Sequence, residues 1–273
     1  MEVGRRSDIL DGVMSKLVAL EAGLRELGPV VVAFSGGADS AFLAYVAHRT
    51  LGSERAHAVT AVSASLATDE EIDCRALAVE WGFRWTPVAT DELAKAAYQV
   101  NDTDRCYHCK AELMDVVGPL ARAENATVVL GVNLDDLGDH RPGQRAAAER
   151  GARFPLVEAG FTKADVRAAS AELGLRTWDK PAAACLASRV PYGTPVTLTV
   201  LTQVDRAEAA LHRLGFRQLR VRHYDTIARL EVDIDDLGAV IARRAEVIDA
   251  VKAVGYRYVT LDLEGFRSGN LNG

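Results

Sequence analysis

The sequence predicts an α/β protein in which an open parallel sheet, covered by helices on both faces, is followed by a smaller α+β domain. Three observations support this fold class. Short β-branched runs alternate with helix-sized amphipathic segments through the first part of the chain, the run 30–34 is continuously apolar, as in parallel strands buried on both faces, and the pattern changes near residue 195. We therefore expect two domains, residues 1–194 and 195–273.

Each expected element has its own local signal. Apolar residues recur at steps of three and four between Leu10 and Leu27, which predicts a first helix that ends at Gly28-Pro29. The expected elements that follow in the first domain are a strand over 30–34, a helix over 40–51, a strand over 57–62, a helix over 69–81, a strand over 84–89, a helix over 107–124, and strands over 127–132 and 154–157. The second domain is expected to hold a helix over 198–214, strands over 216–223 and 226–232, a helix over 236–254 and a strand over 256–263.

Composition and charge exclude several classes of protein. The 273 residues are 49% hydrophobic and 26% charged, which is typical of a globular protein. No apolar run approaches the length of about 18 residues that a membrane span needs, and no apolar signal segment precedes the first helix, so we expect a cytoplasmic protein with no membrane partner. The net charge of −6 disfavours nucleic acid as a partner.

The segment Ser35-Gly36-Gly37-Ala38-Asp39-Ser40 lies between a buried strand and a helix. Paired glycines allow a tight turn and close approach of the backbone, and the free amides of a helix start attract an anion, so we expect a phosphate-binding loop. The segment fits neither the Walker loop nor the dinucleotide fingerprint. The alternative is a tight turn in which Asp39 only caps the helix.

Ligands of open parallel sheets bind beyond the carboxyl ends of the strands, which singles out segments 35–40, 63–68 and 133–140. Ser63 is therefore a candidate for nucleotide binding. In Gly131-x-Asn133-x-Asp135-Asp136 we expect the small residue to face the adenine and the carboxylates to reach magnesium, the alternative being a solvated acidic loop. Lys180 is a candidate for a phosphate contact, although a lone lysine is often merely exposed.

Cysteines form the second group of candidates. Four cysteines are few for a disulfide framework in a cytoplasmic chain, and the spacing Cys106-x-x-Cys109 favours metal or redox chemistry. Together with Cys185, these thiolates would suit an iron–sulfur cluster with one iron left open. Two alternatives stay open: a closed zinc site with His108 or Cys74 as fourth ligand, and non-ligating reduced thiols. Cys74, inside an expected helix, is explained by packing.

These motifs carry a resemblance to known families. The loop resembles the pyrophosphate loop (PP-loop) of ATP pyrophosphatases, enzymes of the adenine nucleotide alpha-hydrolase-like fold that cleave ATP between the α and β phosphates. Over nearly the whole chain the sequence resembles the LarE-type ATP-dependent sulfur transferases. The matching stretches are Ser35 to Ser40, Arg105 to Lys110, Gly131 to Gly143 with Asp139-His140-Arg141-Pro142-Gly143, Trp178 to Gly193, and Tyr258 to Gly265.

The resemblance implies an activity and assigns roles to residues. Such enzymes adenylate a carboxylate of pyridinium-3,5-biscarboxylic acid mononucleotide and convert it to a thiocarboxylate, in making the nickel-pincer nucleotide of lactate racemase. It implies that Ser35, Gly36, Gly37 and Ser40 hold the pyrophosphate of ATP, and that Asp39 and Asp136 position Mg²⁺. It also implies that Cys106, Cys109 and Cys185 hold a [4Fe-4S] cluster, readily lost in air, whereas some members use one cysteine, matching Cys185, as a sacrificial sulfur donor.

Arginines are the candidates for the phosphate of the substrate. Arg220 and Arg222 lie two apart on an expected strand, so their side chains share one face, and they match phosphate-binding arginines of the family. Arg189 is a further candidate, the alternative for each being a surface role. Glu231 matches a metal-linked acid of the family, although strand alternation would equally make it an exposed residue. The partner we expect is a small-molecule nucleotide, bound by a homo-oligomer whose second domain serves substrate binding or oligomerisation.

Three other functions compete with this interpretation. A tRNA thiolation enzyme would share the loop and the three cysteines, but an aromatic content of 6% and the negative net charge are unsuited to RNA. An ammonia-dependent ligase of the NAD synthetase type would need no cysteines. A module that only senses adenine nucleotides would not turn over ATP.

Overall fold

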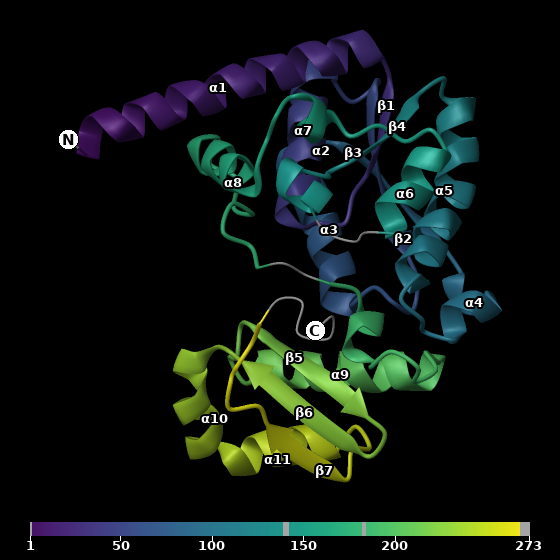
Figure 1. The fold of residues 1–273 in the computed structure, drawn as a ribbon, viewed down its shortest axis with the longest axis vertical. Coiled ribbons are helices and arrows are strands. Elements are labelled where there is room, and N and C mark those ends of the chain that lie inside the picture. The colour runs from purple at the N-terminus through teal and green to yellow at the C-terminus, as the bar shows by residue number, and fades with distance from the viewer. Residues whose placement is uncertain (1, 139–141, 182–183, 268–273) are drawn as a thin grey trace. The chain divides into compact units, whose positions relative to one another are not determined.

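The computed structural model describes residues 2–138, 142–181 and 184–267. They form two compact units (Figure 1). The first consists of Met1–Ser63, Glu70–Thr90 and Cys106–Ala182, and the second of Ala64–Asp69, Asp91–Arg105 and Ala183–Gly273. Residues 184–194 thus pack with the second unit, whereas the expected domain boundary lies at 194/195; that boundary, like the expected homo-oligomer, stays a prediction.

A four-stranded parallel sheet forms the centre of the first unit, in the order β3-β2-β1-β4. Its strands are β1 (Val30–Ala33), β2 (Ala56–Val62), β3 (Arg84–Ala89) and β4 (Thr127–Leu130). The helices of this unit are α1 (Glu2–Leu27), α2 (Ala38–Leu51), α3 (Thr68–Trp81), α5 (Arg105–Ala123), α6 (Pro142–Glu149), α7 (Pro155–Glu158) and α8 (Lys163–Glu172).

Helices cover both faces of this sheet, as the sequence predicts. On β1, Val30 and Val32 belong to the core that α1, α2, α3 and α8 close, whereas Val31 belongs to the core on the side of α5 and α6. Because successive strand residues point to opposite faces, a strand buried on both sides must be apolar throughout. The parallel α/β fold is therefore confirmed.

The expected strand over 154–157 is wrong. This segment forms α7, and only a single bridge between Val129 and Arg153 extends the sheet there. Pro155 occupies the first turn of α7, a position for which its fixed φ suits it. A run of four apolar residues does not by itself distinguish a strand from a buried helical turn.

The second unit contains a three-stranded mixed sheet, as the α+β pattern predicts. β5 (Leu219–Tyr224) pairs antiparallel with β6 (Ile227–Val232), which pairs parallel with β7 (Tyr258–Leu261). Its helices are α4 (Ala96–Gln99), α9 (Leu198–Arg213), α10 (Leu237–Ala242) and α11 (Arg244–Lys252), with short 3₁₀ turns η1 (Glu92–Ala94), η3 (Leu186–Arg189) and η4 (Ile234–Asp236). The single helix expected over 236–254 is divided at Arg243, whose backbone leaves the helical region and whose side chain binds the carbonyl of Leu214.

Among the described residues, no helix combines the length and the apolar character that crossing a membrane requires.

Candidate functional site

The glycine loop at the end of β1 is held by its two serines. Ser40 Oγ accepts a hydrogen bond from the backbone N–H of Ser35 at 3.2 Å and donates to the carbonyl of Gly37 at 3.1 Å, while the two serine hydroxyls lie 3.0 Å apart. Gly36 has φ +72°, and a Cβ there would lie 2.8 Å from Cys74 Sγ. Glycine is thus required twice over, by conformation and by space. No side chain caps the N-terminus of α2 at Gly37, so the amides of its first turn are not taken up by a capping residue.

Two carboxylates meet an amide beside this loop. Asn133 Nδ2 donates to Asp39 Oδ1 at 3.0 Å, and the backbone N–H of Asn133 donates to Asp136 Oδ2 at 3.2 Å. Burial raises the pKa of Asp39, and the negative charge of Asp136 adds to that effect, while the hydrogen bond from Asn133 opposes it. The structure therefore places Asp39, Asn133 and Asp136 together at the carboxyl ends of β1 and β4, in an arrangement that favours a bound cation.

Gly131 directly follows β4 and contacts the loop. A Cβ at this position would lie 2.8 Å from the backbone carbonyl carbon of Asp39 and 2.8 Å from the backbone nitrogen of Ser40. Close packing of β4 against the start of α2 therefore requires glycine, which is a different reason from the expected contact with adenine. That contact stays a prediction.

Lys180 contacts the loop at Gly36, within the first unit. Its Nζ donates to the carbonyl of Gly36 at 3.1 Å and pairs with Glu70 at 2.8 Å and Asp73 at 2.6 Å. Burial alone would lower the pKa of Lys180, but these carboxylates outweigh it and hold the pKa above its ordinary value. The alternative of a merely exposed lysine is wrong. Ser63 follows β2 and is half-buried, and its role in nucleotide binding stays a prediction.

All four cysteines are reduced, and they fall into two classes. Cys74 is buried beneath Gly36, and burial raises its pKa to about 11, which fits a packing role. Cys106 and Cys109 lie three apart at the start of α5, exposed and half-buried respectively, and therefore share one helix face. Cys185 is half-buried and immediately precedes η3 in the second unit.

Within residues 2–138, 142–181 and 184–267, no three side chains of His, Cys, Asp or Glu gather in a way that would hold a metal ion. Convergence of Cys106, Cys109 and Cys185 stays a prediction, since the third belongs to a different unit from the first two. Two parts of the quoted motifs, residues 139–141 and 182–183, lie outside the described residues.

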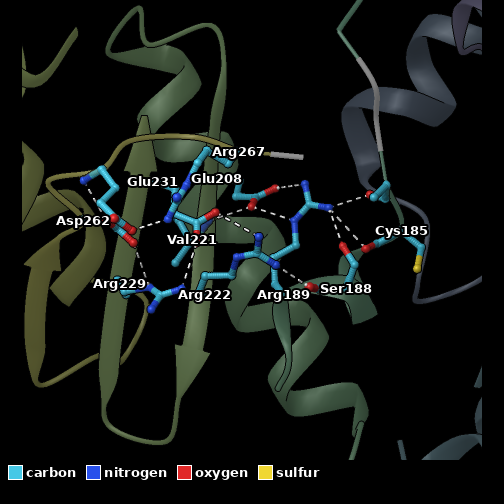
Figure 2. A network of polar contacts seen from close by, with 12 residues as sticks. Cys185, Ser188, Arg189, Glu208, Val221, Arg222, Arg229, Glu231, Asp262 and Arg267 are labelled. Carbon is cyan, nitrogen blue, oxygen red and sulfur yellow. Dashed lines mark hydrogen bonds and ion pairs between the residues drawn. The ribbon is translucent and has the colours of Figure 1, made fainter. Parts of the chain in front are cut away.

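Ionic contacts in the second unit connect residues 185–189, here called the Cys185 segment, to the three-stranded sheet of β5, β6 and β7, here called the small sheet (Figure 2). Arg189 pairs with Glu208 through two nitrogens, each 2.9 Å from a carboxylate oxygen, and also donates to the carbonyl of Cys185 at 3.2 Å. Glu208 in turn accepts the backbone N–H of Val221 at 2.8 Å. Burial would lower the pKa of Arg189, but the charge of Glu208 outweighs it and raises that pKa. Arg189 therefore acts as a structural clamp, and the alternative of a surface role is wrong.

Glu231 is fully buried, so the expectation of an exposed strand residue is wrong. One of its oxygens accepts from Arg222 at 2.9 Å and the other from Arg229 at 2.9 Å. Arg222, also buried, donates as well to the carbonyl of Ser188 at 2.7 Å. Arg222 thus joins the small sheet to the segment that follows Cys185. Both oxygens of Glu231 bind arginine, and its role as a metal ligand stays a prediction.

Arg220 lies near Arg189 and Arg222 but differs from them. Only 6% of its surface is exposed, and among the described residues no carboxylate forms an ion pair with its guanidinium. Burial, followed by the positive charges of Arg189 and Arg222, lowers the pKa of Arg220 to about 10. A buried, unpaired guanidinium among like charges is a site where an anion would be stabilised.

The sequence-based candidates omit three carboxylates that bind candidate residues. Glu70 and Asp73 pair with Lys180, and Glu208 pairs with Arg189. A signal for Glu208 does exist, because Val204, Ala207 and Leu211 mark the buried face of α9 and Glu208 shares that face. A carboxylate on a buried helix face indicates a buried partner. Glu70 and Asp73 lie three apart near the start of α3, and nothing local distinguishes them from an acidic helix start.

Comparison with known proteins agrees with these features. Residues 16–115 match the family model of NAD synthase. The chain is 40% identical to the pyridinium-3,5-bisthiocarboxylic acid mononucleotide synthase of Lactiplantibacillus plantarum, over 94% of each chain. It is also 45% identical to an uncharacterized protein of Synechocystis, over 94% of this chain and 97% of the relative, and 26% identical to an uncharacterized protein of Methanocaldococcus jannaschii, over 93% and 98%.

Proposed function

Because the chain belongs to the family of the pyridinium-3,5-bisthiocarboxylic acid mononucleotide synthases, enzymes of the PP-loop type, we propose that it catalyses the same ATP-dependent sulfur transfer. The substrate would be pyridinium-3,5-biscarboxylic acid mononucleotide, and the product its thiocarboxylate. The observation that carries the proposal is the pair of sites described above: a glycine loop with adjoining carboxylates in one unit, and in the other the buried guanidinium of Arg220, which forms no ion pair among the described residues.

Adenylation has to come first, because a carboxylate is a poor electrophile until it carries a good leaving group. A carboxylate oxygen of the substrate attacks the α-phosphorus of ATP, pyrophosphate leaves, and an acyl adenylate forms. The hydroxyls of Ser35 and Ser40 and the amides of Gly36 and Gly37 would bind the departing pyrophosphate. Lys180 reaches the same loop and would supply positive charge there.

Asp39 and Asp136 fit a magnesium site by the chemistry of their donors. Both carboxylates bind Asn133, and the charge of Asp136 adds to the effect of burial in raising the pKa of Asp39, so a nearby cation would be favourable. When bound there, Mg²⁺ would neutralise charge on the phosphates. The binding residues would be Asp39 and Asp136, with Glu231 as a further candidate for a metal.

In the sulfur-transfer step, sulfide attacks the carbonyl carbon of the acyl adenylate. The bond to AMP breaks, AMP departs, and the product is the thiocarboxylate. Cys106, Cys109 and Cys185 would hold a [4Fe-4S] cluster, which when bound would supply sulfide repeatedly. The thiol chemistry fits: all three are reduced and none is fully buried. In addition, Arg105, the residue before Cys106, donates to the carbonyl of Ala187, two residues after Cys185.

The three arginines would have different roles at the substrate phosphate. Arg222 and Arg189 are engaged by Glu231 and Glu208 and would act mainly by shaping the site. Arg220 would make the principal contact, because no carboxylate among the described residues forms an ion pair with it.

Turnover measurements test this proposal. Purified anaerobically and supplied with sulfide, ATP and Mg²⁺, the protein should form AMP and pyrophosphate only when the pyridinium mononucleotide is present. Formation of AMP with tRNA, or with ammonia and nicotinic acid adenine dinucleotide, would instead support the thiolation or ligase alternative.

A further inference from the structure

A ring lies against Arg220, which among the residues that the structure describes forms no ion pair with a carboxylate. The centroid of the Phe266 ring is 4.6 Å from the guanidinium carbon of Arg220, and both residues belong to the second unit. At this distance the negative face of the ring attracts the cation. Phe266 lies beyond β7, in a segment for which the sequence alone predicts no role.

The backbone fixes the ring in this place. The N–H of Phe266 donates to the carbonyl of Val232, the last residue of β6, at 2.7 Å. Gly265 before it has φ +72°, and a Cβ there would lie 3.0 Å from the carbonyl oxygen of Val232 and 3.0 Å from Ile234 Cγ1. Glycine favours this tight return of the chain onto β6, and the backbone thereby fixes the position of Phe266.

Carboxylates hold the neighbouring arginines in a different way. Glu208 binds Arg189, and Glu231 binds both Arg222 and Arg229, so N–H groups of these side chains are occupied. An aromatic face holds a guanidinium without accepting any of its five N–H groups in the plane. Contact with the ring therefore holds the cation in place without a carboxylate on its donors, which leaves them available to an anion.

We propose that Phe266 is a positioning residue that orients Arg220 for the phosphate monoester of the substrate. This inference rests on the proposed function, since it takes Arg220 to bind that phosphate. A carboxylate in place of the ring would orient the guanidinium equally well but would compete with the phosphate. Phe266 thereby contributes to the preference for a phosphorylated nucleoside over the unphosphorylated one.

Paired ligands isolate the phosphate in a test. Nicotinic acid mononucleotide and nicotinic acid riboside differ only by the phosphate. The Kd of the riboside divided by the Kd of the mononucleotide therefore reports how much the phosphate contributes to binding. We expect Phe266→Leu to reduce this ratio about fivefold, which is within the range of a cation–π contact, and Phe266→Tyr to retain it. Arg220→Met should reduce the ratio by more than tenfold, and Phe266→Leu in that background should change it no further.

The outcomes separate this inference from the proposed function. An unchanged ratio in Phe266→Leu, with a reduced ratio in Arg220→Met, would overturn the role of Phe266 and leave the phosphate assignment standing. An unchanged ratio in Arg220→Met would overturn the phosphate assignment itself. ATP affinity and thermal denaturation serve as controls. A variant that keeps the ATP affinity and the Tm of the parent is folded, because loss of folding would change both. Phe266→Met replaces Phe266→Leu if the latter does not fold, and the same comparison then decides.

Discussion

Replacing Gly131 by alanine tests the packing of β4 against the glycine loop. The added Cβ would lie 2.8 Å from two backbone atoms of Asp39 and Ser40, whereas ordinary contacts begin at 3.4 Å, and backbone cannot rotate away as a side chain can. Overpacking of this kind costs about 1 to 3 kcal/mol. In a chain of this size Tm would fall by about 2 to 12 °C. Because the displaced atoms belong to the loop, ATP affinity should fall about tenfold or more.

Thermal denaturation and ATP titration measure the two effects on the same preparation. Gly23→Ala is the matched control, because a Cβ at Gly23 in α1 meets no atom within 4 Å. That variant should bind ATP normally and be more stable by about 0.5 to 1 kcal/mol, the ordinary gain of alanine over glycine within a helix. If Gly131→Ala kept both the Tm and the ATP affinity of the parent, the described contact between β4 and the loop would be refuted.

Three further substitutions distinguish structural from functional charges. Asp39→Asn should abolish most substrate-dependent AMP formation, yet stabilise the ligand-free protein at pH 7, because burial raises the pKa of Asp39 and the ionised form is therefore the costly one. This gain should vanish as the pH falls below about 4, the ordinary pKa of aspartate, where both side chains are neutral, and equal stabilities at pH 7 would contradict the reasoning. Arg222→Met should destabilise the protein by about 3 to 5 kcal/mol, because it removes a buried partner of Glu231. Arg220→Met breaks no ion pair among the described residues and should lose much less stability in urea denaturation.

The glycine loop and its sheet could be predicted because local patterns determine them. The continuous apolar strand 30–33 indicates a parallel sheet, and the carboxyl ends of such strands share an edge, which places Asp39, Asn133 and Asp136 together. By contrast, α7 was not predictable from periodicity, because four apolar residues fit either structure. The capping box of Thr162 and Asp165 at the start of α8 is a signal that the expected element order omits.

Roles of the individual arginines could not be predicted for a different reason. Alternation places Arg220 and Arg222 on one face of β5, but it does not say which of them meets a carboxylate from another strand. That depends on Glu231 in β6 and on the return of the chain at Gly265, both of which are tertiary contacts. The same holds for Glu231, whose burial depends on what covers its face of the sheet.

The central claim is that this chain transfers sulfur to an adenylated carboxylate of a pyridinium mononucleotide. Its most direct test is to count AMP and thiocarboxylate formed per chain after anaerobic reconstitution, in the parent and in Cys106→Ala. The account predicts equal amounts of AMP and thiocarboxylate, several turnovers per parent chain, and loss of repeated turnover in the variant. One thiocarboxylate per chain in both proteins, with conversion of Cys185 to dehydroalanine, would contradict the cluster route. AMP formed without any thiocarboxylate would contradict sulfur transfer altogether.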